Sequence, residues 1–155
     1  MPDLEPKPTL VVGYDGSAAS RAALLFAARQ AGRAGRVFVV HAYEPPPEAL
    51  GSPNYQRVLS ERRDRGEALL LELPLAEEGL AGPVYDTELI GGPPARAIVA
   101  VARTRHADEI VIGARGLGRM RALLGSVSHE ILHMADRPVV VIPAAAIGPE
   151  STEEA

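Results

Sequence analysis

The sequence has 155 residues, of which 46% are hydrophobic and 23% are charged, a composition typical of one globular domain with a sizeable core. It contains no cysteine, which excludes a disulfide framework and a thiolate metal site, and no apolar run approaches the ~20 residues that a membrane helix needs. The formal net charge of -4, without a dense basic face, argues against a nucleic-acid partner.

The chain begins with a polar, proline-rich segment, residues 1–8, that is expected to be flexible. This segment lacks the basic and apolar regions of a signal peptide, so a cytoplasmic location is expected by elimination. The apolar run Leu10–Val12 then predicts a first strand, and Ser17 is suited to cap a helix that runs toward Gly32. A second strand is predicted at Val37–Val40.

An irregular insertion is expected at residues 44–54, where prolines interrupt any regular pattern. Residues 55–73 predict a second helix with a charged, exposed side, and residues 84–90 predict a third strand. A third helix is expected to start at Gly91–Pro94, because proline suits the first turn of a helix. The predicted buried stripe of this helix consists of Ala95, Ile98, Val99 and Ala102.

The last part of the chain repeats this alternation. A fourth strand is predicted at Glu109–Ile112, and the fifth at Val139–Ile142. Residues 144–155 are small and acidic and are expected to be disordered. Apolar runs that alternate with helices predict an α/β fold, a single Rossmann-like open and mainly parallel sheet with helices on both faces. The stripe that marks the final helix consists of Val127, Ile131, Met134 and Ala135.

The glycine-rich segment 113–128, between the fourth strand and the final helix, carries the strongest functional signal. Glycines let backbone N–H groups approach a ligand, and a helix N-terminus adds unpaired donors and the positive end of a dipole. Arg115, Arg119 and Arg121 add three positive charges and no negative one. The segment therefore favours a polyanion such as a nucleotide phosphate, and the alternative is a surface loop with solvated arginines.

Two common phosphate-binding motifs are absent from the sequence. No Gly-Lys-Ser/Thr tripeptide of a Walker A loop occurs, and Arg121 stands where the G-x-G-x-x-G fingerprint that begins at Gly116 needs its third glycine. Without the P-loop lysine, phosphoryl transfer loses its main charge stabiliser. No catalytic lysine or general base is identified, so we expect a protein that holds a phosphate rather than an enzyme, with slow ATP hydrolysis left open.

The chain resembles the universal stress proteins of the nucleotide-binding kind, whose signature is Gly, two residues, Gly, nine residues, Gly-Ser/Thr. Gly113 and Gly116 match its first pair, and Gly125-Ser126 matches its end. The likeness covers residues 9–143, which are expected to form the universal stress protein domain. Its further motifs, in the family's order, are Val11–Ser17, Val39–Ala42, Gly92–Ala95 and Arg137–Ile142.

The resemblance implies a strand order of 3-2-1-4-5 and a site for ATP with Mg²⁺ where the order reverses, between the first and fourth strands. It implies that Asp15 and Ala42 lie on the adenine side, with Mg²⁺ near Asp15, and that Gly113 and Gly116 lie near the ribose and phosphates. It also implies that the phosphate tail is surrounded by Gly125, Ser126, Val127 and Ser128. On local chemistry alone, the alternative is that Asp15 is a plain turn residue, since Asp-Gly-Ser is strong turn and capping chemistry.

One departure from the family pattern bears on function. Eight residues, not nine, separate Gly116 from Gly125, a change that can move the amides of Gly125 and Ser126. Two functions therefore stay open. The first is a nucleotide-binding regulatory protein whose ATP-bound state modulates an unknown protein partner. The second is a dimeric interaction module of the same fold that does not bind nucleotide.

The sequence His129-Glu130-Ile131-Leu132-His133 matches the H-E-x-x-H motif of zinc peptidases. That chemistry needs a third protein ligand, and no further histidine follows. Because Ile131 belongs to the predicted core stripe, both histidines are expected to lie toward the solvent. No protein metal site is therefore predicted here, and whether this pair binds a metal is left open.

A homodimer is expected to form through Val139–Ile142. The resemblance places this apolar strand at a sheet edge, where it is an aggregation hazard unless it is covered or paired. Two-fold pairing would close the edge and make a self-complementary interface. The alternative is a monomer whose edge is blunted by Pro138 and Pro143, and a charge at Val140 is expected to cost little in that case.

Overall fold

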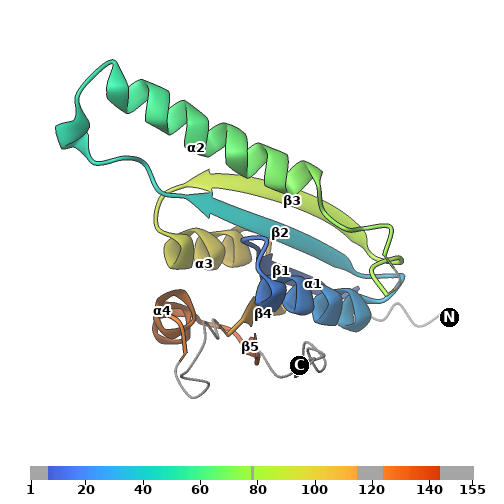
Figure 1. Ribbon diagram of the computed structural model, residues 1–155. Helices are drawn as coiled ribbons and strands as arrows, with labels where there is room; N and C mark the ends of the chain where they lie inside the picture. Colours follow the sequence, from blue (N-terminus) through green and yellow to red (C-terminus); the bar gives the residue numbers. More distant parts are fainter. Residues whose placement is uncertain (1–6, 78, 115–123, 144–155) are drawn as a thin grey trace, which may run out of the picture.

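The computed structural model describes residues 7–77, 79–114 and 124–143, and in these ranges strands alternate with helices (Figure 1). The strands are β1 (Thr9–Gly13), β2 (Arg36–Tyr43), β3 (Val84–Gly91), β4 (Glu109–Gly113) and β5 (Val139–Ile142). The helices are α1 (Ala18–Ala31), α2 (Asn54–Leu71), α3 (Pro94–Thr104) and α4 (Ser126–Met134), with a short 3₁₀ helix, η1, at Glu48–Leu50. The described chain contains no helix that is both long enough and apolar enough to cross a membrane.

All strand pairings in the sheet are parallel, and the order is β3-β2-β1-β4-β5. Both the fold class and the strand order expected from the sequence are confirmed. Parallel strands covered on both faces need apolar side chains at successive positions, which is why β1, β2, β4 and β5 contain short apolar runs. In β1, for example, Leu10, Val11 and Val12 are all buried. The strand order reverses between β1 and β4. The strand that follows β1 in sequence, β2, lies on one side of this pair, and the strand that follows β4, β5, lies on the other side.

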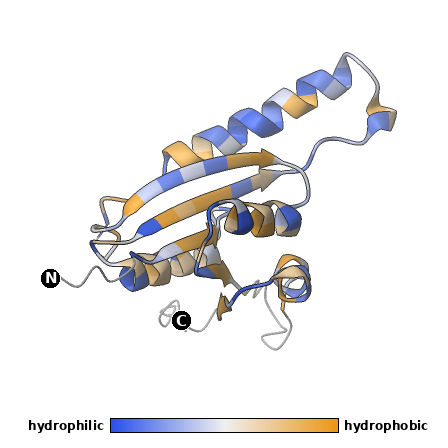
Figure 2. Cartoon of the chain, turned by 180° about the vertical axis from the view of Figure 1, so that it is seen from behind, coloured by the Kyte–Doolittle hydropathy of each residue, from blue (hydrophilic) through white to orange (hydrophobic). Residues whose placement is uncertain are grey.

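The helices form a layer on each face of the sheet (Figure 1). Alternate side chains of each strand enter different cores because successive Cβ atoms point to opposite faces. Leu10 and Val12 pack in one core with α1 and the end of α2, whereas Val11 packs in the other with α3 and Ile131 of α4. Figure 2 shows β2 mostly in hydrophobic colours and β3, at the edge, in alternating hydrophobic and hydrophilic colours, while the end of α2 that extends past the sheet is largely hydrophilic.

The ends of α1 and α3 follow the predicted capping chemistry. Ser17 caps α1, since its Oγ accepts a hydrogen bond from the N–H of Ser20 at 3.2 Å. Pro94 is the first residue of α3, where its missing N–H would have no helical partner. α2, in contrast, ends at Leu71, two residues earlier than its pattern predicts. Pro74 disfavours helical backbone at the residue before it, and Leu71 is 87% exposed.

Candidate functional site

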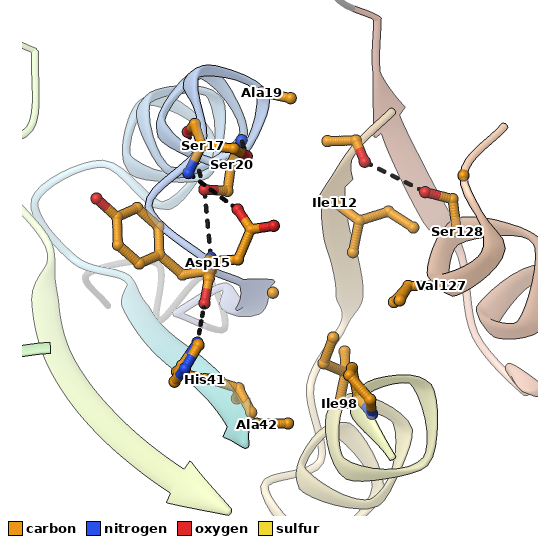
Figure 3. Close-up of a pocket in the computed structure, with 16 residues that line it drawn as sticks. Asp15, Ser17, Ala19, Ser20, His41, Ala42, Ile98, Ile112, Val127 and Ser128 are labelled. Carbon is orange, nitrogen blue, oxygen red and sulfur yellow. Dashed lines mark hydrogen bonds between the residues drawn. The ribbon is translucent and has the colours of Figure 1, made fainter. Parts of the chain in front are cut away.

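A cleft of about 180 Å³ lies at the carboxyl ends of β1 and β4, where the strand order reverses. Figure 3 shows its two walls, with Asp15, Ser17 and Ser20 on one side and Val127 and Ser128 on the other. The cleft can accept a ring system, because a cavity of about 150 Å³ holds benzene. The lining residues are Gly13, Tyr14, Asp15, Ser17, Ala19, Ser20, Val40, His41, Ala42, Pro94, Ile98, Ile112, Gly113, Gly125, Val127 and Ser128.

The turn from β1 to α1 fixes the carboxylate of Asp15 at the edge of the cleft. The N–H of Ser17 donates to Oδ1 of Asp15 at 2.9 Å, and the N–H of Asp15 donates to Oγ of Ser20 at 3.3 Å. Gly16 lies between them with a φ of 79°, a conformation that side chains rarely adopt. Asp15 is therefore a turn residue, as its local chemistry predicts, and its exposed carboxylate also lines the cleft.

His41 joins the carboxyl ends of β1 and β2 beside this turn. Its Nδ1 lies 2.8 Å from the Tyr14 carbonyl oxygen, which can only accept, so Nδ1 carries the proton (Figure 3). The next residue, Ala42, has a side chain small enough to leave space at this end of the cleft. Burial raises the pKa of the Tyr14 phenol above its usual range, and this effect outweighs the nearby Arg21 guanidinium, which lowers it. The phenol is therefore neutral at physiological pH.

The opposite wall is held together by Gly113 and Ser128. Ser128 is only 3% exposed, and its hydroxyl lies 3.2 Å from the Gly113 carbonyl oxygen, to which it donates a hydrogen bond (Figure 3). A Cβ on Gly113 would lie 2.6 Å from the carbonyl carbon of Ala19 and 2.7 Å from its oxygen. The close approach of α1 therefore requires glycine at this position even without a ligand.

The N-terminus of α4 opens toward the cleft. Its N-cap residue, Gly125, has extended backbone and no side chain that could accept a hydrogen bond from the first turn, in contrast to Ser17 at α1. The carbonyl of Gly125 accepts from the N–H of His129 at 3.0 Å, the first helical bond. The N–H groups of Ser126, Val127 and Ser128 are therefore at the positive end of the helix dipole, where an anion is stabilised.

Six of the eight sequence-predicted site residues line this one cleft, namely Asp15, Ala42, Gly113, Gly125, Val127 and Ser128. Ser126 is exposed at the start of α4 and does not line it, and Gly116 lies outside the described residues, as do Arg115, Arg119 and Arg121. Sequence reasoning did not assign His41 or Pro94 to the site. Two signals could have identified them: His41 lies near the carboxyl end of β2, and Pro94 lies at the start of α3.

The polar groups that line the cleft differ between its two walls. Among the described residues that line the cleft there is no lysine, and His41 uses Nδ1 to hold Tyr14. Within the described ranges, no group of three or more histidine, cysteine, aspartate or glutamate side chains is arranged to hold a metal ion. The cleft has a carboxylate on one wall and helix N–H donors on the other.

The sequence matches the universal stress protein family over residues 8–143. A curated universal stress protein of Thermus aquaticus is 40% identical over 136 residues, which cover 86% of this chain and 97% of that protein. The chain spans about half the length of several other curated universal stress proteins that it matches.

Solved structures have the same fold. Universal stress protein UspA from Lactobacillus plantarum is 21% identical, with a TM-score of 0.71 over 88% of this chain and 97% of that chain. A universal stress protein solved in complex with cAMP is 26% identical, with a TM-score of 0.58 over 88% of this chain and 97% of that chain.

Proposed function

The chain belongs to the universal stress protein family, and from this premise we propose that it is a regulatory protein that binds ATP with Mg²⁺ in the cleft between β1 and β4. The observation that carries the proposal is the pairing of two walls, one with the Asp15 carboxylate and one with the open N-terminus of α4. The likeness to a protein in complex with cAMP supports an adenine nucleotide as the ligand class.

In this proposal each part of the nucleotide meets residues of matching chemistry. The adenine lies beside Asp15 and Ala42, and the ribose and first phosphate lie near Gly113 and Gly116. The phosphate tail accepts hydrogen bonds from the amides of α4's first turn, in the segment Gly125–Ser128. The hydroxyl of Ser128 already donates to Gly113, so this residue contributes its amide.

The proposed Mg²⁺ arrives with the nucleotide. This cation prefers oxygen ligands, keeps several waters, and is commonly held by one or two carboxylates and the substrate phosphates. The Asp15 carboxylate is such a ligand and is held in place by the Ser17 N–H. Mg²⁺ would neutralise charge on the phosphates, while the amides of α4 fix their position.

The lining residues support regulation rather than rapid turnover, because among those described none is a lysine that could stabilise a transferring phosphoryl group. In this proposal, the ATP-bound state of the protein binds a protein partner differently from the state without ATP.

The second candidate function is a dimeric interaction module of the same fold that does not bind nucleotide. The spacing of eight residues between Gly116 and Gly125 favours this candidate. A cytoplasmic location is part of the proposal.

Isothermal titration of the purified protein with Mg-ATP distinguishes these two functions. We expect a micromolar dissociation constant, about -8 kcal/mol, and adenine nucleotide in the supernatant when the protein as purified is denatured. Titration with Mg²⁺ alone is the control. No heat and no thermal shift at millimolar Mg-ATP would contradict the nucleotide proposal and leave the interaction module.

We also propose that two copies associate through β5. This strand ends the sheet with β4 as its neighbour. The Pro138 carbonyl accepts a hydrogen bond from Ile110 of β4 at 2.9 Å, and the Ile142 carbonyl accepts one from Ala114, the residue after β4, at 2.8 Å. Val139 and Val141, which alternate with the bonded residues of β5, therefore turn their backbone N–H and C=O groups away from β4. Such an edge can pair with another strand, and two-fold pairing of β5 with itself closes both edges.

Replacing Val141 by proline tests this dimer, because it removes an N–H that faces away from β4 and leaves the ladder to β4 intact. We expect the dimer to weaken about tenfold or more, since two-fold pairing loses two hydrogen bonds of about 1 kcal/mol each. Light scattering over a concentration series measures the change, and Val141→Thr, which keeps the N–H, is the matched control. A monomeric parent protein at micromolar concentration would rule the dimer out.

A charge at Val140, which the sequence suggested as a test, is less informative in the structure. Val140 is half-buried and packs against the core that contains α1, so a charge there destabilises the monomer as well as the dimer. The backbone substitution at Val141 avoids this ambiguity.

A further inference from the structure

The two histidines of the H-E-x-x-H sequence converge on the exposed side of α4. Ile131, between them, is fully buried, whereas His129 and His133 are exposed, as their positions in the helix predict. The two Nε2 atoms lie 3.2 Å apart, and the rings meet edge to face with centroids 4.6 Å apart. Neither residue lines the nucleotide cleft. The pair is therefore separate from the proposed nucleotide site.

The separation of the two nitrogens matches two ligands of one metal ion. Histidine nitrogens bind Zn²⁺ at about 2.0–2.1 Å, so two of them at a tetrahedral angle lie roughly 3.3–3.4 Å apart. We propose that Nε2 of His129 and Nε2 of His133 chelate one divalent transition-metal ion of the kind that imidazole prefers, Zn²⁺, Ni²⁺ or Cu²⁺. Mg²⁺, which prefers oxygen ligands, would not bind there.

The position of the pair in the helix favours a cation. His133 lies in the last turn of α4, at the negative end of the helix dipole. Two arginines near this end of α4, Arg103 and Arg137, both pair with Asp136, at 3.4 and 3.0 Å, and Arg103 also donates to the Met134 carbonyl at 3.4 Å. Added positive charge beside His133 is therefore stabilised by the helix dipole.

Metal binding requires only a change of tautomer. Without metal, one imidazole donates its Nε2 proton to the other across the 3.2 Å contact. With metal, both rings carry their proton on Nδ1 and present both Nε2 lone pairs to the ion. The described residues offer no third histidine, cysteine or carboxylate, so water completes the coordination. The site is a two-ligand chelate and lacks the ligand set of a zinc peptidase.

The experiment is a Cu²⁺ and Ni²⁺ titration of the full chain without an affinity tag. We expect both ions to raise the melting temperature, and the electron paramagnetic resonance spectrum of bound Cu²⁺ to show two equatorial nitrogens. His129→Ala and His133→Ala should each weaken binding about 100-fold, because the second ligand acts at high effective concentration. Both variants should keep their helical circular dichroism, since alanine is the better helix former.

His106→Asn is the matched control, because it removes an exposed histidine elsewhere. Asparagine tolerates the φ of 50° at this position, so the fold is preserved. This variant should bind both ions like the parent. Equal affinity in the parent and in His129→Ala, or a Cu²⁺ spectrum with one nitrogen ligand, would overturn the proposal. Neither readout involves ATP, so it can fail while nucleotide binding stands.

Discussion

Replacing Gly125 by valine is expected to abolish phosphate binding while the fold persists. The backbone of Gly125 is extended, with a φ of -62° and a ψ of 162°, a conformation that valine adopts readily. The new side chain would stand where the proposed phosphates approach the amides of α4. Loss of two hydrogen bonds to a charged group, each about 1.5–3 kcal/mol, raises the Mg-ATP dissociation constant about 100-fold or more.

Two controls separate this steric effect from a change in the fold. Adenosine, which has no phosphate, should bind Gly125→Val and the parent with similar affinity in isothermal titration. Ser126→Ala should be milder, because it removes a hydroxyl bond worth about 0.5–1.5 kcal/mol and keeps the amide. If Gly125→Val binds Mg-ATP as tightly as the parent, the phosphates do not lie at α4.

The alternation of strands and helices could be predicted because apolar residues are spaced differently along the sequence in buried parallel strands and in amphipathic helices. The strand Val139–Ile142 was predicted at its observed bounds, and Ser17 was predicted as the cap of α1. Strand order could not be predicted from periodicity, since pairing is a long-range property, and it came from the family resemblance. The 3₁₀ helix at Glu48–Leu50 was missed because its proline-rich surroundings indicate only irregular backbone.

The site was predictable where local chemistry and topology coincide. Asp15 lies just after β1 and Gly113 ends β4, and because these strands are neighbours in the sheet both residues line the same cleft. The role of Gly113 could not be inferred, because the sequence does not show that α1 approaches it closely. His41 was missed for a similar reason, since its hydrogen-bond partner, the carbonyl of Tyr14, lies 27 residues away.

Gly113→Ala is expected to be strongly destabilising, although it adds one methyl group. That methyl would lie 2.6–2.7 Å from three atoms of Ala19, two of them backbone atoms of the first turn of α1. Backbone in a capped helix cannot give way as a side chain does, so α1 or β4 must shift. Overpacking of this kind costs about 1–3 kcal/mol in the free energy of unfolding, which urea denaturation measures.

Gly13→Ala is the matched control, because Gly13 ends β1 as Gly113 ends β4. Its added methyl would lie 2.7 Å from Cδ1 of Ile98, the flexible end of a side chain that can rotate away. Where no strain results, a glycine-to-alanine change stabilises the folded protein by about 0.4–1 kcal/mol, because it reduces the conformational entropy of the unfolded chain. This gain offsets part of the cost of moving the Ile98 side chain. We therefore expect Gly113→Ala to lower the free energy of unfolding clearly more than Gly13→Ala. Equal losses would mean that glycine at position 113 is not required by α1, and ligand approach would then be the better reason for it.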